Sequence, residues 1–242
     1  MREWAGKRYW LIGASEGLGR SLALAMSKMG CQLVLSARNA ERLQALADEL
    51  PGKAEIKTVD VGDRAALEAA ATEIGPIDGM VYLAGVYWPI NAKEWNTEQA
   101  EAMCDINMMG AIRSVGAVLP AMLERGVGHI VLTGSLSGFR GLPGAVGYGA
   151  SKAGMMSLAE TMRIDLKGTG VEVQLANPGF IRTRLTDKND FQMPFIMEPE
   201  DAAQSMMDLM NSDRFSMSYP WVFASFFRLT QFMPNWMYYR IF

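Results

Sequence analysis

The chain has 242 residues, a net charge of −3 and a sequence pI near 5.4. With 50% hydrophobic residues it can cover a sheet on both faces, and we expect one domain over residues 1–242. The acidic balance argues against nucleic-acid binding, which needs a basic surface. Two cysteines, Cys31 and Cys104, suit a reducing compartment and form neither a disulfide framework nor a zinc site. No signal-peptide pattern opens the sequence, so we expect a cytoplasmic protein.

The first predicted strand, residues 9–12, runs directly into a glycine-rich turn, Gly13-Ala14-Ser15-Glu16-Gly17-Leu18-Gly19. Apolar residues at helical spacing follow from Arg20 to Met29. Between a strand and a helix, glycines let the backbone approach a pyrophosphate, and the helix N-terminus supplies free N–H groups. The segment predicts dinucleotide binding. The alternative is a tight turn that uses the glycines only for positive φ angles.

The same turn also matches the G-x-S-x-G nucleophile elbow of hydrolases, with Ser15 as the nucleophile. A Ser-His-Asp hydrolase would have to use His129, the only histidine in the chain. The third glycine, Gly19, and the position of the turn near the start of the chain favour the dinucleotide. We therefore expect a structural role for His129 at the edge of its strand.

The second predicted strand, residues 32–37, indicates which dinucleotide binds. Folds that bind NAD place an acid at the end of this strand to accept hydrogen bonds from the ribose. Here Ala37 occupies that place and Arg38 follows, so a guanidinium is available for a 2′-phosphate. Ser15 can add a hydroxyl contact. The pattern favours NADP(H) over NAD(H), and the alternative for Arg38 is a solvated residue before the helix at 40–50.

Four further strands are predicted at residues 55–59, 79–83, 127–133 and 171–176, with helical segments between them. Strands that alternate with helices imply right-handed crossovers and a parallel sheet. We therefore predict an α/β fold, a Rossmann-like doubly wound sheet with helices on both faces. Alternation of Phe215, Met217 and Tyr219 predicts a last edge strand.

Tyr148 and Lys152 stand four residues apart in the helix that is predicted to start near Val146. This spacing puts both side chains on one helix face. A tyrosine has a pKa of about 10, and a nearby positive charge lowers it. The pair predicts a proton-transfer site in which Lys152 lowers the pKa of Tyr148.

Taken together, these segments resemble the short-chain dehydrogenase/reductase family from about residue 7 to residue 183. Gly13, Gly17 and Gly19 match the family's glycine turn, and the serine at position 135 stands thirteen residues before Tyr148, the family's usual separation. The resemblance implies further cofactor contacts from Leu18, Asp60, Val61, Ala84, Gly85, Pro178, Gly179, Ile181 and Thr183, with Tyr148 and Lys152 also touching the cofactor.

The resemblance also implies the catalytic roles. Tyr148 exchanges the proton with the substrate oxygen, Ser135 holds that oxygen, and Lys152 binds the nicotinamide ribose. Asn107 stabilises the sheet and positions a water that connects Lys152 to solvent. The alternatives are Ser137 in place of Ser135, and for Asn107 an ordinary mid-helix residue bonded to the backbone.

The sequence departs from the family pattern at four positions. Ile12 replaces the threonine that opens the glycine motif, Tyr82 and Leu83 replace two asparagines, and Gly134 replaces a serine. We expect Ile12 and Leu83 to face each other across adjacent strands, with an apolar contact replacing a polar one.

The expected function is an NADP(H)-dependent carbonyl reductase or alcohol dehydrogenase that acts on a lipophilic small molecule, as a homodimer or homotetramer. The main alternative is a non-catalytic dinucleotide-sensing or membrane-associated scaffold on the same fold. A third alternative is an epimerase or dehydratase that uses the same Tyr-Lys pair.

Residues 184–242 are expected to form a substrate lid and an aromatic C-terminal extension. The lid covers residues 184–197, and acids with Pro199 then predict a helix start. The aromatic tail after Pro220 contains no stretch near the ~20 apolar residues that span a bilayer. Three interpretations remain open for it: packing on its own core or a second subunit, peripheral membrane contact, or closure over a lipophilic substrate.

Overall fold

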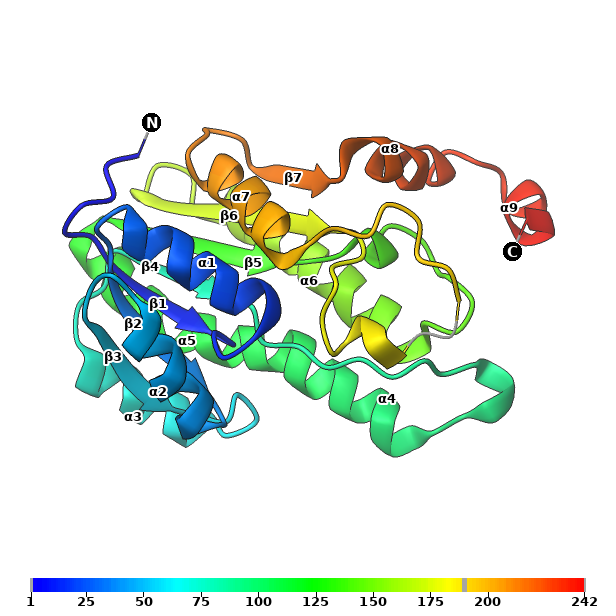
Figure 1. Ribbon diagram of the computed structural model, residues 1–242. Helices are drawn as coiled ribbons and strands as arrows, with labels where there is room; N and C mark the ends of the chain where they lie inside the picture. The colour runs from blue at the N-terminus through cyan, green and yellow to red at the C-terminus, as the bar shows by residue number, and fades with distance from the viewer. Residues whose placement is uncertain (1, 189–190, 242) are drawn as a thin grey trace.

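The computed structural model describes residues 2–188 and 191–241 and contains a parallel sheet of seven strands (Figure 1). The strand order is β3-β2-β1-β4-β5-β6-β7, so the chain winds outward in both directions from β1. The strands are β1 (Arg8–Ile12), β2 (Gln32–Ala37), β3 (Ala54–Thr58), β4 (Gly79–Tyr82), β5 (Gly128–Thr133), β6 (Val171–Pro178) and β7 (Ser216–Tyr219). The predicted doubly wound α/β fold and the last edge strand are confirmed.

Helices cover both faces of this sheet (Figure 1). The α-helices are α1 (Gly17–Lys28), α2 (Ala40–Glu49), α3 (Arg64–Ile74), α4 (Thr97–Cys104), α5 (Gly110–Arg125), α6 (Val146–Asp165), α7 (Pro199–Met210), α8 (Trp221–Thr230) and α9 (Asn235–Ile241). Short 3-10 helices are η1 (Ala92–Glu94), η3 (Leu136–Gly138) and η4 (Thr186–Lys188), and η2 (Asp105–Met109) is a π-helical turn between α4 and α5. The α1 helix begins at Gly17, three residues before the predicted start, so Leu18 and Gly19 lie in its first turn.

Two apolar cores lie on opposite faces of the sheet because strand side chains alternate. One core packs α1, α2 and α7 on the sheet through residues such as Leu22, Leu43 and Met206. The other packs α3, α5 and α6, with Leu67 and Met155 among its members. The strands β1, β4 and β5 are almost wholly buried, as expected for a parallel sheet covered on both sides.

The expected contact between the side chains of Ile12 and Leu83 is wrong. The Leu83 amide does donate to the Ile12 carbonyl at 2.8 Å. However, the register pairs Ile12 with Tyr82, and both belong to the core under α3, α5 and α6. Leu83 packs with the opposite core, because the next residue along a strand faces the other way.

One helical stretch in the described part of the chain, Thr97–Arg125, is long and apolar enough to cross a membrane by length and composition alone. In this fold it is interrupted by the π-helical turn η2. Its α4 part packs against α6, and its α5 part packs against α3. Both parts therefore pack against other helices of the domain.

Candidate active site

A cleft of about 590 Å³ opens where β1, β4, β5 and β6 end at their carboxyl sides. Open parallel sheets bind ligands at this edge, where the strand order reverses direction. All the residues predicted to contact a cofactor line this one cleft: Gly13, Ser15, Gly17, Leu18, Gly19, Arg38, Asp60, Val61, Ala84, Gly85, Tyr148, Lys152, Pro178, Gly179, Ile181 and Thr183. The tertiary structure thus brings together six separate sequence segments.

The glycine turn has a shape that only glycine allows. Gly13 has a φ of 95°, and a Cβ there would lie 2.4 Å from the Ala84 nitrogen. A Cβ on Gly19 would lie 2.2 Å from the Gly13 carbonyl oxygen. The turn leads into α1, whose N-cap residue Glu16 makes no side-chain cap, so the first N–H groups of the helix stay available to a ligand. This cradle fits the pyrophosphate of a dinucleotide.

Charged side chains surround Glu16 at the end of the cleft that is expected to hold the cofactor ribose, which we call the ribose wall. Its carboxylate pairs with Arg42 at 3.0 Å and with Arg184 at 2.7 Å, so its negative charge is compensated. Arg38 is exposed on the cleft and has no hydrogen bond or ion pair among the described residues. Its guanidinium is therefore available to an anionic ligand. Arg42 is a second cation on this wall, which the sequence reasoning missed although it lies one helical turn beyond Arg38.

Tyr148 lies in the first turn of α6 and lines the cleft. Burial raises the pKa of its hydroxyl to about 12, although a hydrogen bond with Ser135 acts in the opposite direction. The Tyr87 ring packs edge-on against it with centroids 5.1 Å apart. The prediction that the pKa of Tyr148 is lowered is wrong for this structure. Burial of the hydroxyl raises the pKa by more than the hydrogen bond with Ser135 lowers it.

Lys152 shares the helix face of Tyr148 but contacts its ring rather than its hydroxyl. The ammonium Nζ lies 5.6 Å from the ring centroid and donates to the Thr133 carbonyl at 2.8 Å. Burial lowers the pKa of the ammonium to about 8, since little water reaches it. Lys152 therefore carries its charge only below about this pH, which the sequence alone did not indicate.

Ser135 follows β5 and directs its hydroxyl towards Tyr148. The hydroxyl of Ser137 donates to Ser135 Oγ at 3.0 Å, so the two serines form one polar pair. Ser135 is the member in contact with Tyr148, and Ser137 supports it. The preceding residue is Gly134 because a Cβ there would lie 2.1 Å from Oδ1 of Asn177.

Asn107 is fully buried in the π-helical turn η2. Its amide accepts from the Val86 nitrogen at 2.8 Å, and donates to the Val86 carbonyl at 3.0 Å and to Ser151 Oγ at 3.1 Å. These contacts join the loop after β4 to α6 beside Lys152. Asn107 bonds to the backbone, as the alternative expects, but the π-turn directs its amide across to a loop and another helix.

The contact that supports this π-turn was not predicted from the sequence. Tyr82, at the end of β4, donates its hydroxyl to the Ile106 carbonyl at 2.5 Å. Gly110 makes room for it, since a Cβ at that position would lie 2.3 Å from the Tyr82 hydroxyl oxygen. Tyr82 thus replaces the expected asparagine with a longer side chain that reaches the π-turn directly.

Residues expected to form the lid reach across the cleft. Arg184 pairs with Glu16 on the glycine turn, and Lys188 donates to the Tyr87 carbonyl at 2.7 Å. Asn189 and Asp190, part of the same expected lid, lie outside the described residues. Where the chain is described again, Phe195 has a φ of 57° and packs on Phe223 of α8 with centroids 5.6 Å apart.

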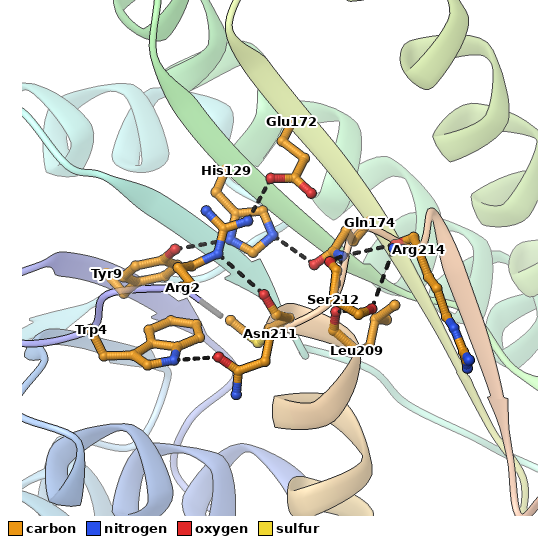
Figure 2. Close-up of polar contacts among 11 residues, drawn as sticks. Arg2, Trp4, Tyr9, His129, Glu172, Gln174, Leu209, Asn211, Ser212 and Arg214 are labelled. Atoms are coloured by element: carbon orange, nitrogen blue, oxygen red, sulfur yellow. Dashed lines mark hydrogen bonds and ion pairs between the residues drawn. The ribbon is translucent and has the colours of Figure 1, made fainter.

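A second polar cluster lies at the opposite, amino end of the strands (Figure 2). Gln174 donates to the carbonyls of Leu209, Ser212 and Arg214, so its Oε1 accepts from His129 Nε2 at 2.9 Å. His129 Nδ1 then accepts from the Tyr9 hydroxyl at 2.9 Å. Burial lowers the pKa of His129 to about 3 and keeps the ring neutral.

His129 is the second residue of β5, and its hydrogen bonds with Tyr9 and Gln174 give it a structural role near the edge of its strand. Its register partners, Gly79 and Glu172, are the first residue of β4 and the second residue of β6, whereas Ser15 follows the end of β1. The two residues are therefore at opposite ends of the sheet. This separation removes the hydrolase alternative. Among the described residues, no cluster of three or more His, Cys, Asp or Glu side chains could hold a metal ion.

Comparisons with known proteins agree with this architecture. Residues 7–193 match the short chain dehydrogenase family. An uncharacterized oxidoreductase of Myxococcus xanthus is 39% identical over 97% of this chain and 96% of its own length. A short-chain dehydrogenase from Sphingobium yanoikuyae in complex with NADPH superimposes with a TM-score of 0.82 at 28% identity, covering 89% of this chain and 88% of that chain.

A closed form of serine dehydrogenase complexed with NADP+ gives a TM-score of 0.81 at 29% identity, covering 87% of this chain and 93% of that one. Both solved structures thus share the overall fold of this chain at similar identity. The chain belongs to the short-chain dehydrogenase/reductase family and is an NAD(P)-dependent oxidoreductase.

Proposed function

We propose that the protein is an NADP(H)-dependent carbonyl reductase that transfers a hydride to a lipophilic ketone or aldehyde, with Tyr148 as the proton donor. The reverse oxidation of the alcohol uses the same groups. The observation that carries the proposal is that Tyr148 and Lys152 line the cleft that also holds the glycine cradle, with Ser135 hydrogen-bonded to Tyr148.

The protonation state of Tyr148 supports reduction. With a pKa of about 12 its hydroxyl is protonated at neutral pH and is ready to donate to a carbonyl oxygen. Ser135 supplies a second hydroxyl beside it and stabilises the negative charge that develops on that oxygen. The cationic form of Lys152 adds positive charge beneath the tyrosine ring. The cofactor, when bound, supplies the hydride.

The preference for NADP(H) is supported by the charge of the ribose wall. Arg38 is unpaired among the described residues, Arg42 stands beside it, and the acid Glu16 is neutralised by Arg42 and Arg184. A guanidinium binds a phosphate bidentately, whereas it gains little from the bare ribose hydroxyls of NAD. The solved relatives named above hold NADPH and NADP+.

A lipophilic substrate is supported by the aromatic wall beside the cleft. Phe180 contacts Phe191 and Phe223 with centroids 5.9 and 5.8 Å apart. Gly179 lines the cleft, and a Cβ on it would lie 3.3 Å from the Phe223 ring. These rings favour an apolar substrate body with a single polar carbonyl directed at Tyr148.

The test is oxidation of NADPH with a panel of aromatic and long-chain ketones and aldehydes, compared between the wild type and Tyr148→Phe. We expect turnover by the wild type and a loss of about 10³-fold or more in the variant, because the donated proton is removed. NADPH binding, measured by fluorescence, should stay within about threefold, since the variant keeps the ring. Turnover by Tyr148→Phe near the wild-type rate would refute the proton-donor role. NADPH binding without turnover of any substrate in the panel would favour the scaffold alternative.

A further inference from the structure

We propose that α8 and α9 form a membrane-binding surface that inserts aromatic and aliphatic side chains at the headgroup boundary of an anionic lipid bilayer. This C-terminal surface is defined by Trp221, Phe226, Leu229, Phe232, Trp236 and Tyr239. Figure 1 shows both helices beyond the carboxyl end of the sheet, with α9 at the outer end of the molecule.

The α8 helix carries large apolar side chains on both sides, although Ser225 and Arg228 are also exposed on its outer side. Its inner side buries Ala224 and Phe227 against Leu136. Its outer side exposes Trp221 and Leu229, which are 76% and 68% accessible and lie eight residues apart on one helix face. A helix that faces water on one side normally carries polar residues there, and one that is hydrophobic all round is normally covered. We therefore expect another apolar surface to cover the outer side of α8.

Exposed apolar side chains are concentrated in this segment. Of the 18 large hydrophobic residues exposed in the described part of the chain, nine fall within residues 221–241. Several are tryptophan or tyrosine, the residue types that collect at the membrane–water interface because one part of the ring system is apolar and another is polar. Scattered exposed hydrophobic residues need no explanation, but their concentration in one segment does.

The charge of the segment matches an anionic surface. From Arg214 to the end of the chain the sequence contains Arg228 and Arg240 and no aspartate or glutamate. Neither Arg228 nor Arg240 forms an ion pair with a described residue, and both are exposed. Basic residues beside an interfacial apolar face strengthen binding to anionic lipids.

The same charges argue against a second copy of the chain as the binding partner of the C-terminal surface. A two-fold symmetric contact would place this surface against itself. All four of these arginines, Arg228 and Arg240 of each copy, would then lie in one interface with no aspartate or glutamate in either segment to compensate them. A lipid headgroup layer supplies the missing negative charge.

The surface is held in a fixed orientation by Arg140. Its guanidinium donates to the Met233 carbonyl and to Asn235 Oδ1, each at 2.7 Å, and it lies 3.9 Å from the centroid of the Tyr238 ring. Tyr238 in turn donates to the Gly141 carbonyl at 2.5 Å. The loop that carries Arg140 follows Ser135 and η3, so the membrane-facing side is tied to the substrate side of the cleft.

The experiment is flotation of the full-length protein with vesicles of phosphatidylcholine, with and without phosphatidylglycerol. We expect binding that requires phosphatidylglycerol and weakens at high salt. The variant Leu229→Ser/Phe232→Ser/Trp236→Ser should lower the partition coefficient by at least about 100-fold, because three interfacial side chains are lost. The variant Arg228→Glu/Arg240→Glu should lower it roughly tenfold or more.

The matched control is Ile164→Ser/Trp95→Ser/Val127→Ser, which changes side chains that are 73%, 58% and 54% exposed on other parts of the surface. Its partition coefficient should stay at the wild-type value, and the melting temperatures of all variants should confirm folding. Should the tail variant fail to fold, quenching of wild-type tryptophan fluorescence by brominated lipids, absent in Trp221→Phe/Trp236→Phe, gives the same information.

Absence of wild-type binding to the anionic vesicles would overturn the proposal, as would undiminished binding by the folded tail variant. A concentration-dependent dimer that disappears in the tail variant, without vesicle binding, would assign the surface to a second copy instead.

Discussion

Tyr9 and Tyr148 lie at opposite ends of the sheet, and both hydroxyls are held by a neighbouring side chain. Tyr9 is 1% exposed and donates to His129, which donates to Gln174, whose amide hydrogens are taken up by backbone carbonyls (Figure 2). Every polar group in this chain of contacts has its partner. Such a closed network stabilises a core and has no capacity left for a ligand.

Tyr148 differs because its contacts leave it open to the cleft. Its hydroxyl is hydrogen-bonded to Ser135, and its side chain lines the cleft of about 590 Å³. Arg38 and Lys152 line the same space, and the one hydrogen bond of Lys152 with a described residue goes to the Thr133 carbonyl. In this protein the buried hydroxyl whose hydrogen-bonding capacity faces a cavity is the functional one, and the hydroxyl whose capacity is filled is structural. Three variants or conditions test this distinction.

The largest effect is expected at the ribose wall. Arg38→Glu should change the ratio of kcat/KM for NADPH to that for NADH by about 100-fold or more towards NADH, because a phosphate contact becomes a repulsion. Steady-state kinetics with both cofactors measure the ratio. The control Arg163→Glu changes an exposed arginine on α6 away from the cleft and should leave it unchanged. An unaltered ratio in Arg38→Glu would remove Arg38 from the cofactor site.

A smaller effect is expected from the protonation of Lys152, whose pKa is lowered to about 8 by burial. The ammonium loses its charge as pH rises through this value, so kcat/KM for NADPH, which reports the free enzyme, should fall about tenfold per pH unit above it. Tyr148 stays protonated over this range because its pKa is about 12.

Lys152→Arg is the matched variant for this pH profile, since a guanidinium stays charged throughout. Its remaining activity should show no inflection near pH 8. A wild-type profile that is flat up to pH 10 would contradict the assignment.

The smallest effect on activity is expected at the other end of the sheet. Tyr9→Phe leaves His129 Nδ1 without a donor and should lower the free energy of unfolding by about 1–3 kcal/mol. Turnover at a temperature where the variant is folded should remain within about twofold, because Tyr9 does not touch the cleft. Denaturant melts and initial rates give both values. Tyr239→Phe, at an exposed tyrosine, is the control for stability. A large loss of turnover in folded Tyr9→Phe would mean that the two ends of the sheet are coupled.

Local sequence patterns were sufficient for much of the fold and for the composition of the cleft. The glycine turn, the apolar strands and the 13-residue separation of Ser135 and Tyr148 are readable because each depends on neighbours in the chain. Parallel strands that all end at one edge then bring their loops together, so every expected cofactor contact lines one cleft. Boundaries shifted by one to three residues, as at α1, because helix ends depend on packing as well as on composition.

Other properties were decided only by the tertiary structure. Solvent exclusion raises the pKa of Tyr148, against the direction that its spacing to Lys152 suggests. Strand register sends Leu83 away from Ile12 and directs Tyr82 to the π-turn that holds Asn107. His129 became a core residue because β6 and α7 deliver Gln174 and its acceptors to it. Burial, register and long-range partners arise from segments far apart in the chain, and no local pattern encodes them.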